Sequence, residues 1–266
     1  ISEKLKNELI EKDQKNKEII KPLLRGRDIE KYGMNFQNLW LINTHNGYIE
    51  DGDEIPPVNV KNDYPSLWNY FKQINDENDK RVENRYDQGD HWTNLRTCQY
   101  ISDLEKDKIV YPETTVGRSE FYLDRDNFYL DKTCFFITGN HLEYINAILA
   151  SQVIEYYLEH KVRLLGKRSI QYSKQYIKEV PIPEVPQKIE KIIIDLVNEI
   201  LSTEEEASGI ENLLDLIVYK LYNLNKSEIE IIDPDIDSTL QKFELNFQEY
   251  NGLDISKLAE YPIMNS

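Results

Sequence analysis

Two arginines, a tryptophan and two amides lie around one glycine in the segment Arg-Tyr-Asp-Gln-Gly-Asp-His-Trp-Thr-Asn-Leu-Arg, which runs from Arg85 to Arg96. Arginine and asparagine can pair bidentately with guanine and adenine edges, and an aromatic ring can fill the space left by a flipped base. The candidate base contacts here are Arg85, Trp92, Asn94 and Arg96. A polar loop whose Trp92 packs into the core is an alternative that the residue types do not separate.

A second cluster is basic: the stretch from Lys161 to Lys178 contains six cations and no acid. Its Gly-Lys-Arg-Ser-Ile-Gln-Tyr-Ser-Lys core supplies cations, hydroxyls and an amide on a glycine-opened loop, which suits phosphate contacts. A solvated helix end, where cations complement the helix dipole, is the alternative. The absence of acids favours phosphate contact, and the candidates are Lys167, Arg168, Ser169, Gln171, Tyr172 and Lys174.

The sequence lacks the motifs of a self-sufficient methyltransferase. None of its ten glycines forms a GxG or GxxxxGK loop, so no nucleotide- or S-adenosylmethionine-binding turn is expected. Its one Pro-Pro pair, Pro56-Pro57, has the wrong neighbours for an amino-methyltransferase catalytic loop. We therefore expect no cofactor and no catalytic residue in this chain.

Metal chemistry is also not expected. Carboxylate clusters such as Glu105-Lys-Asp-Lys arise easily by chance among 48 acids. His45 and His91 lack a partnered nucleophile, and Cys98 and Cys134 form no CxxC pair, so reduced thiols in a cytoplasmic protein are the favoured interpretation.

The net charge of −16 argues at first against nucleic acid, but the charge is unevenly distributed. The segment 202–266 holds 14 acids against four bases, so most of the excess negative charge lies at the C-terminal end.

The apolar runs are too short for a membrane span, and 40% hydrophobic residues suffice for a core. The first residue is Ile1 and no apolar signal core follows, so we expect a piece of a longer protein.

The apolar pattern predicts an α+β fold: a twisted mixed or antiparallel sheet with two long helices, then a C-terminal helical hairpin and an acidic tail. The expected helices span 64–86, 142–162, 187–201 and 204–222, and the expected strands lie near 39–43, 108–112, 120–123, 128–130 and 134–138. We divide the chain into a helical lead-in at 1–20, a central domain at 21–186 and a helical C-terminal region at 187–266.

Several segments, in order, resemble the TaqI-like C-terminal specificity domain of adenine-specific DNA methyltransferases and single-chain restriction-modification enzymes. They are Lys21-Pro-Leu-Leu-Arg-Gly-Arg-Asp-Ile, Trp92-Thr-Asn-Leu-Arg-Thr-Cys, Lys108-Ile-Val-Tyr-Pro-Glu, Leu130-Asp-Lys-Thr-Cys-Phe-Phe-Ile-Thr-Gly, Ile148-Leu-Ala-Ser, Gln171-Tyr-Ser-Lys-Gln-Tyr-Ile and Pro181-Ile-Pro. The resemblance covers about residues 21–186.

The resemblance implies a domain that reads a short site in double-stranded DNA and presents the target adenine to an upstream methyltransferase domain. That domain would use S-adenosylmethionine, and the expected location is the cytoplasm, with no membrane contact. The candidate DNA-contacting residues are Arg25, Arg27, Arg85, Trp92, Asn94, Arg96, Arg118, Lys167, Arg168, Ser169, Gln171, Tyr172 and Lys174.

Two other functions compete with DNA reading. A protein-interaction module, in which the helical hairpin and acidic tail assemble subunits, predicts salt-insensitive partner binding and no affinity for duplex DNA. A nuclease half of a restriction enzyme predicts magnesium-dependent cleavage, and it ranks last because the sequence offers no credible metal cluster.

Overall fold

A computed structural model describes the chain except for residues 79, 117–118, 162–163, 166–168, 204–206 and 262–266. The described residues form two compact units from interleaved segments. Unit 1 comprises 1–28, 36–108 and 124–132, and unit 2 comprises 29–35, 109–123 and 133–266. The division of the chain into 1–20, 21–186 and 187–266 stays a prediction.

Unit 1 is built around strand β1 (Ile20–Leu24), which lies between two other strands. It pairs antiparallel with β4 (Trp40–Ile42) and parallel with β10 (Tyr129–Leu130). A small core of buried apolar side chains joins this sheet to the helices; it consists of Leu9, Ile19, Ile20, Ile42, Val60, Tyr64 and Leu67. The other α-helices and strands described in the unit are α1 (Glu3–Lys12), α2 (Val60–Asp63), α3 (Pro65–Glu77), α4 (Ile101–Leu104), β5 (Tyr48–Glu50) and β6 (Asp53–Ile55), and two short 3-10 helices span Gln14–Glu18 and Gly26–Asp28.

Two carboxylates of unit 1, Glu105 and Asp124, each have a lysine partner within the unit. Glu105 accepts hydrogen bonds from Lys21 Nζ at 2.9 Å and from the Tyr129 hydroxyl at 2.8 Å. Burial tends to raise the pKa of Glu105, but these two donors outweigh it and the pKa is lowered. The Lys108 ammonium lies 2.6 Å from the Asp124 carboxylate, and both side chains are 0% exposed. Burial raises the pKa of Asp124 although Lys108 opposes the shift.

Unit 2 carries the larger core, which contains side chains of its C-terminal helices and the strand residues Ile109, Tyr111 and Leu123. Among the described residues of the unit, the strands form three small sheets. In one sheet β7 (Lys108–Pro112) lies between β9 (Tyr122–Asp124) and β11 (Cys134–Ile137). The first residue of β7, Lys108, and the last residue of β9, Asp124, belong to unit 1. In another, β13 (Ser169–Gln171) pairs antiparallel with β8 (Thr114–Val116) and β12 (Leu164–Leu165). The third is the short pair β2 (Ile29–Glu30) and β3 (Gly33–Met34).

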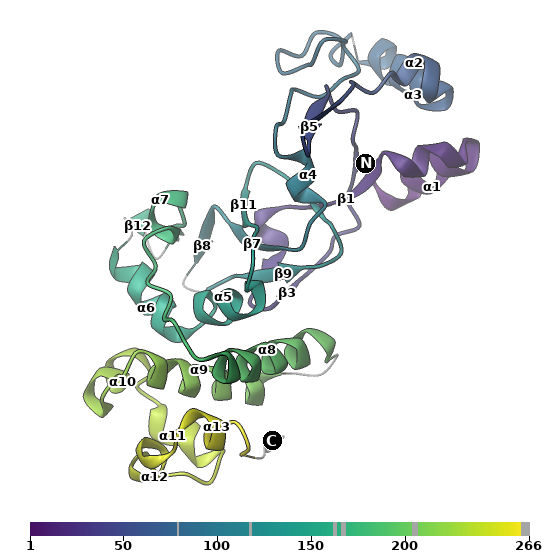
Figure 1. The fold of residues 1–266 in the computed structure, drawn as a ribbon. Coiled ribbons are helices and arrows are strands. Elements are labelled where there is room, and N and C mark those ends of the chain that lie inside the picture. The colour runs from purple at the N-terminus through teal and green to yellow at the C-terminus, as the bar shows by residue number, and fades with distance from the viewer. Residues whose placement is uncertain (79, 117–118, 162–163, 166–168, 204–206, 262–266) are drawn as a thin grey trace. The chain divides into compact units, whose positions relative to one another are not determined.

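The helices of unit 2 follow the amphipathic pattern of the sequence. Their bounds are α5 (Leu142–Leu149), α6 (Gln152–Lys161), α7 (Lys174–Ile177), α8 (Gln187–Ser202), α9 (Ser208–Leu221), α10 (Lys226–Ile232), α11 (Ile236–Gln241), α12 (Phe247–Gly252) and α13 (Ile255–Leu258). Helices α8 and α9 lie side by side and form the expected hairpin (Figure 1). The acidic tail forms short helices, and capping boxes at Asn225 and Asn246 begin two of them.

The structure confirms the α+β class and revises three details of the prediction. The described strands form five small sheets instead of one twisted sheet. The helix expected over 64–86 ends at Glu77. The helix expected over 142–162 is broken at Ala150, because the Ser151 hydroxyl donates to the Ile148 carbonyl at 2.7 Å and accepts the Ile154 N–H at 3.4 Å. Ser151 thus begins α6 as a separate helix.

None of the helices in the described part of the chain is long and apolar enough to cross a membrane.

Candidate nucleic-acid interface

The segment 85–97 of unit 1, called here the recognition loop, is closed on itself by backbone contacts. Gln88 and Leu95 form an antiparallel bridge. The Gly89 N–H donates to the Asn94 carbonyl at 3.0 Å, and the Asn94 N–H donates to the His91 carbonyl at 2.8 Å. Although most of its residues are polar, the segment therefore forms a tight turn whose backbone conformation is fixed by hydrogen bonds.

Asn94 fastens the recognition loop to the rest of unit 1. Its side chain is buried, with 2% exposure, and its Nδ2 donates to the His45 carbonyl at 3.1 Å and to the Val58 carbonyl at 2.9 Å. The Thr44 hydroxyl donates to the Thr93 carbonyl at 2.6 Å, close to the same attachment point. In this conformation the Asn94 amide serves the protein backbone, which favours a structural role over the predicted contact with adenine.

Gly89 is required by close packing at the base of the loop. A Cβ atom added there would lie 2.5 Å from the Asn46 side chain and 2.6 Å from the Leu95 carbonyl oxygen. Asn46 uses that space to accept the Asp90 N–H at 2.8 Å and to donate to the Thr97 hydroxyl at 3.0 Å. Position 89 therefore requires glycine, because a larger residue would collide with Asn46 where the recognition loop packs against it.

The two arginines of the recognition loop have different environments. Arg85 is half-buried; it donates from Nη2 to the Asn94 carbonyl, and its Nε lies 3.9 Å from Asp87. Arg96 is exposed. Within the part of the chain that the structure describes, no carboxylate forms an ion pair with Arg96. The loop therefore uses one guanidinium internally and presents the other to solvent.

Trp92 packs within an aromatic cluster. Its ring centroid lies 5.5 Å from that of Trp68 on α3 and 5.7 Å from that of His91. The side chain stays partly exposed, so Trp92 both covers α3 and reaches the surface.

Further exposed side chains lie beside these residues, and the sequence did not single them out. Tyr86 is 100% exposed, Tyr100 is 55% exposed, and Gln88 is also exposed. Their residue types alone could not predict this exposure, because it depends on which neighbouring side chains are buried in the fold. An exposed aromatic ring next to an inward-facing arginine is a candidate for stacking on a base.

The earlier pair, Arg25 and Arg27, lies after β1 in unit 1. Arg25 donates to Asp28 from Nε at 2.9 Å and from Nη2 at 2.8 Å, and this hydrogen bonding raises the pKa of Arg25. Arg27 is exposed. Arg25 therefore has a fixed partner, whereas Arg27 stays a predicted DNA contact.

The predicted phosphate contacts belong to unit 2. Tyr172 is 0% exposed, its N–H donates to the Glu113 carbonyl at 2.9 Å, and its ring stacks on Phe121 with centroids 5.6 Å apart. Burial raises the pKa of Tyr172. Gln171 is half-buried at the end of β13, opposite Thr114. Tyr172 is thus a core residue in this conformation.

Lys174 is exposed at the start of α7 and stays a predicted phosphate contact. Ser169 begins β13, where its backbone pairs with Val116. Arg118, Lys167 and Arg168 lie outside the described residues.

A partly buried ionic cluster in unit 2 was not foreseen from the sequence. Lys31 Nζ lies 3.1 Å from Glu211 and 3.7 Å from Asp215, and the backbone N–H of Gln152 donates to Asp215 at 2.9 Å. Burial lowers the pKa of Lys31, but the two carboxylates outweigh it and the pKa is raised; burial raises the pKa of Asp215. The cluster ties segment 29–35 and α6 to α9, which is a structural role.

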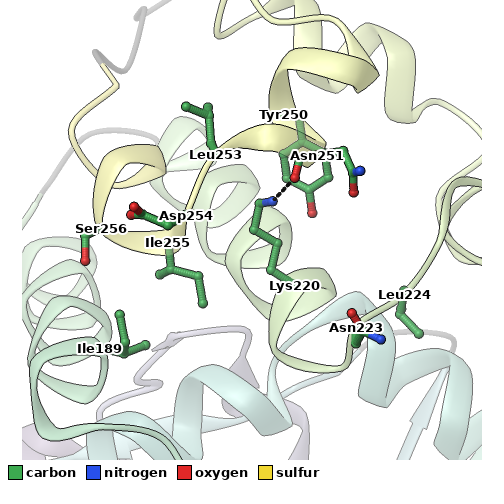
Figure 2. A pocket seen from close by; sticks show the side chains of 10 residues that line it. All are labelled: Ile189, Lys220, Asn223, Leu224, Tyr250, Asn251, Leu253, Asp254, Ile255 and Ser256. Atoms are coloured by element: carbon green, nitrogen blue, oxygen red, sulfur yellow. Dashed lines mark hydrogen bonds between the residues drawn. The ribbon is translucent and has the colours of Figure 1, made fainter.

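A pocket of about 440 Å³ lies between α8, the end of α9 and the helices α12 and α13. Figure 2 shows Lys220 pointing toward the Asn251 carbonyl, to which its Nζ donates at 3.4 Å. The same ammonium lies 4.4 Å from the centroid of the Tyr250 ring, and burial lowers the pKa of Lys220. Lys220 thus fastens α12 to α9, and we interpret the pocket as a gap between packed helices.

Over the part of the chain that the structure describes, no group of three or more His, Cys, Asp or Glu side chains is placed to hold a metal ion.

Comparisons with known proteins agree with the resemblance seen in the sequence. The type II methyltransferase M.BstVI of Geobacillus stearothermophilus is 25% identical over 219 residues, which cover 81% of this chain and 36% of that protein. A solved structure of the type IIL restriction-modification enzyme MmeI in complex with DNA has a similar fold, with a TM-score of 0.57 and 13% identity over 97% of this chain and 34% of that one. The chain therefore spans about a third of the length of each relative. The model of the TaqI-like C-terminal specificity domain matches residues 21–182, and the chain belongs to this family.

Proposed function

We propose that this chain is the sequence-specific recognition domain for double-stranded DNA of an N6-adenine methyltransferase or restriction-modification enzyme. The domain would position the target adenine for a catalytic domain outside these 266 residues, and that domain would bind S-adenosylmethionine. A cytoplasmic location follows from this role. The similarity to a type II methyltransferase and the family match support the proposal.

The recognition loop is the observation that carries the proposal. DNA sequence is read by side chains that meet base edges at fixed positions, so a reading surface needs a defined backbone beneath exposed hydrogen-bonding groups. The loop has both properties: Asn94 and Gly89 fix the backbone, while Gln88 and Arg96 are exposed.

The negative net charge is compatible with this role if a second domain supplies part of the phosphate contacts. We therefore expect weak overall affinity in the isolated chain and a modest dependence on salt. Each phosphate contact contributes a slope of about −0.9 in a plot of log affinity against log salt concentration.

The test is a fluorescence anisotropy titration of the chain with a labelled pool of random duplexes, followed by sequencing of the bound fraction. A short enriched motif, with affinity that falls as salt rises, is the expected result. No binding at low salt, and none after an upstream methyltransferase domain is joined to the chain, would instead favour the interaction module.

Methylation is tested separately. A protein that joins this chain to a methyltransferase domain should transfer label from S-adenosylmethionine to adenine N6 within the enriched motif. Transfer to cytosine would contradict the adenine part of the proposal and leave DNA recognition standing.

A further inference from the structure

The recognition loop contains two arginines whose environments separate their roles. Arg85 donates to the Asn94 carbonyl from within the loop, whereas Arg96 is exposed and has no ion-pair partner among the described residues. A guanidinium that already has a protein acceptor contributes to holding the loop. A guanidinium that faces solvent keeps its donors for a ligand.

Both neighbours of Arg96 make hydrogen bonds, one through its backbone and the other through its side chain. On one side the Leu95 N–H donates to the Thr44 carbonyl at 2.8 Å. On the other side the Thr97 hydroxyl accepts a hydrogen bond from Asn46 Nδ2 at 3.0 Å. The Arg96 side chain therefore extends from a fixed position, which reduces the entropy lost when it meets a partner in one geometry.

The chemistry of an exposed, backbone-anchored arginine fits one base in particular. The guanidinium presents two parallel N–H donors, and guanine O6 and N7 are two adjacent acceptors in the major groove. Resting on the proposed function, we propose that Arg96 is the guanine-reading residue of the recognition loop and that Arg85 is a positioning residue. The sequence recognised by this domain then contains a G·C pair that depends on Arg96.

The experiment compares Arg96→Ala with the wild-type chain by repeating the duplex selection and by measuring affinity for the wild-type motif. We expect the variant to lose its preference at one G·C position and to keep the others. Affinity for the motif falls about 5- to 150-fold, while affinity for a duplex altered at that pair is unchanged. Arg81→Ala is the control, because Arg81 is an exposed arginine outside the recognition loop and should leave the motif unchanged.

Arg85→Ala separates positioning from reading. It should lower the melting temperature and weaken binding to all duplexes, yet retain the order of preferred bases. Arg96→Ala should melt like the wild type, since its side chain is exposed.

Two results would overturn the assignment of Arg96 while leaving DNA recognition intact. Uniform weakening across sequences, with a salt slope reduced by about one, would make Arg96 a phosphate contact. An unchanged motif and affinity would remove Arg96 from the interface. If the wild-type chain enriches no motif, even with the catalytic domain joined to it, the proposed function and this inference fail together.

Discussion

Replacing Asn94 by alanine should destabilise unit 1 more than replacing Asn46, the other asparagine that fastens the recognition loop. The Asn94 amide donates to the carbonyls of His45 and Val58, and the side chain is buried. The His45 carbonyl keeps the Val58 N–H as a second donor at 3.0 Å, so its loss is partial. A lost buried hydrogen bond costs about 1 kcal/mol, and a buried acceptor left unsatisfied costs about 1–3 kcal/mol. We therefore expect a loss of about 2–3 kcal/mol.

Thermal unfolding followed by circular dichroism measures this loss. For a chain of this size each kcal/mol corresponds to about 2–4 °C, so the melting temperature of Asn94→Ala should fall by about 4–12 °C. Asn46→Ala is the matched control: it also removes an amide that fastens the loop, but its two hydrogen bonds are exposed and its effect should be under about 1.5 kcal/mol. Equal melting temperatures for Asn94→Ala and the wild type, or a larger effect of Asn46→Ala, would refute the structural role of Asn94.

Three further changes test the packing and electrostatics of unit 1. Lys108→Met leaves the Asp124 carboxylate buried without its cation, so denaturant titration should show that the free energy of unfolding falls by about 3–5 kcal/mol at pH 7.5. This loss should become smaller toward pH 5 as Asp124 takes up a proton, and a loss independent of pH would argue against the buried pair. Gly89→Ala places a methyl group 2.5 Å from Asn46 and should cost about 1–3 kcal/mol, whereas a silent variant would mean that the loop shifts freely. The pKa of Glu105 is lowered in the folded chain, so its stabilisation is present above the unfolded pKa near 4.5 and is lost as pH falls through the lower folded-state pKa. The stabilities of Glu105→Gln and the wild type should differ at pH 7 by under about 1 kcal/mol and approach each other as the pH is lowered below 4.5; a difference that does not change with pH would contradict this role.

The helices and strands that could be predicted are those in which apolar residues recur at a regular spacing along the sequence. The hairpin of α8 and α9 and the strand β7 match their predicted positions closely, because their apolar spacing identifies the buried face without reference to other segments. The break between α5 and α6 has a local cause, the Ser151 hydroxyl that caps α6, and a distant one, the Gln152 N–H that donates to Asp215. The distant contact has no local sequence pattern.

The candidate site shows the same division between local and distant causes. The segment 85–96 was identified from residue types, and the structure places it in a closed loop. Which of its side chains face inward depends on partners 36 and 49 residues away along the chain, Val58 and His45 for Asn94. No local pattern encodes such contacts, so the sequence could not distinguish Arg85 from Arg96 or draw attention to Tyr86.

The interleaving of the two units limits how specificity could be transplanted between relatives. The stretch 36–108 belongs to unit 1 without interruption, and the chain belongs to unit 2 immediately before and after it. A chimaera that exchanges 36–108 would transfer the recognition loop together with its attachment points at Thr44, His45 and Val58. It would also bring a foreign β4 against the resident β1, where Ile20 lies opposite Ile42. Retargeting by segment exchange therefore requires compatible side chains at that strand pair and a lysine at position 108 for the resident Asp124.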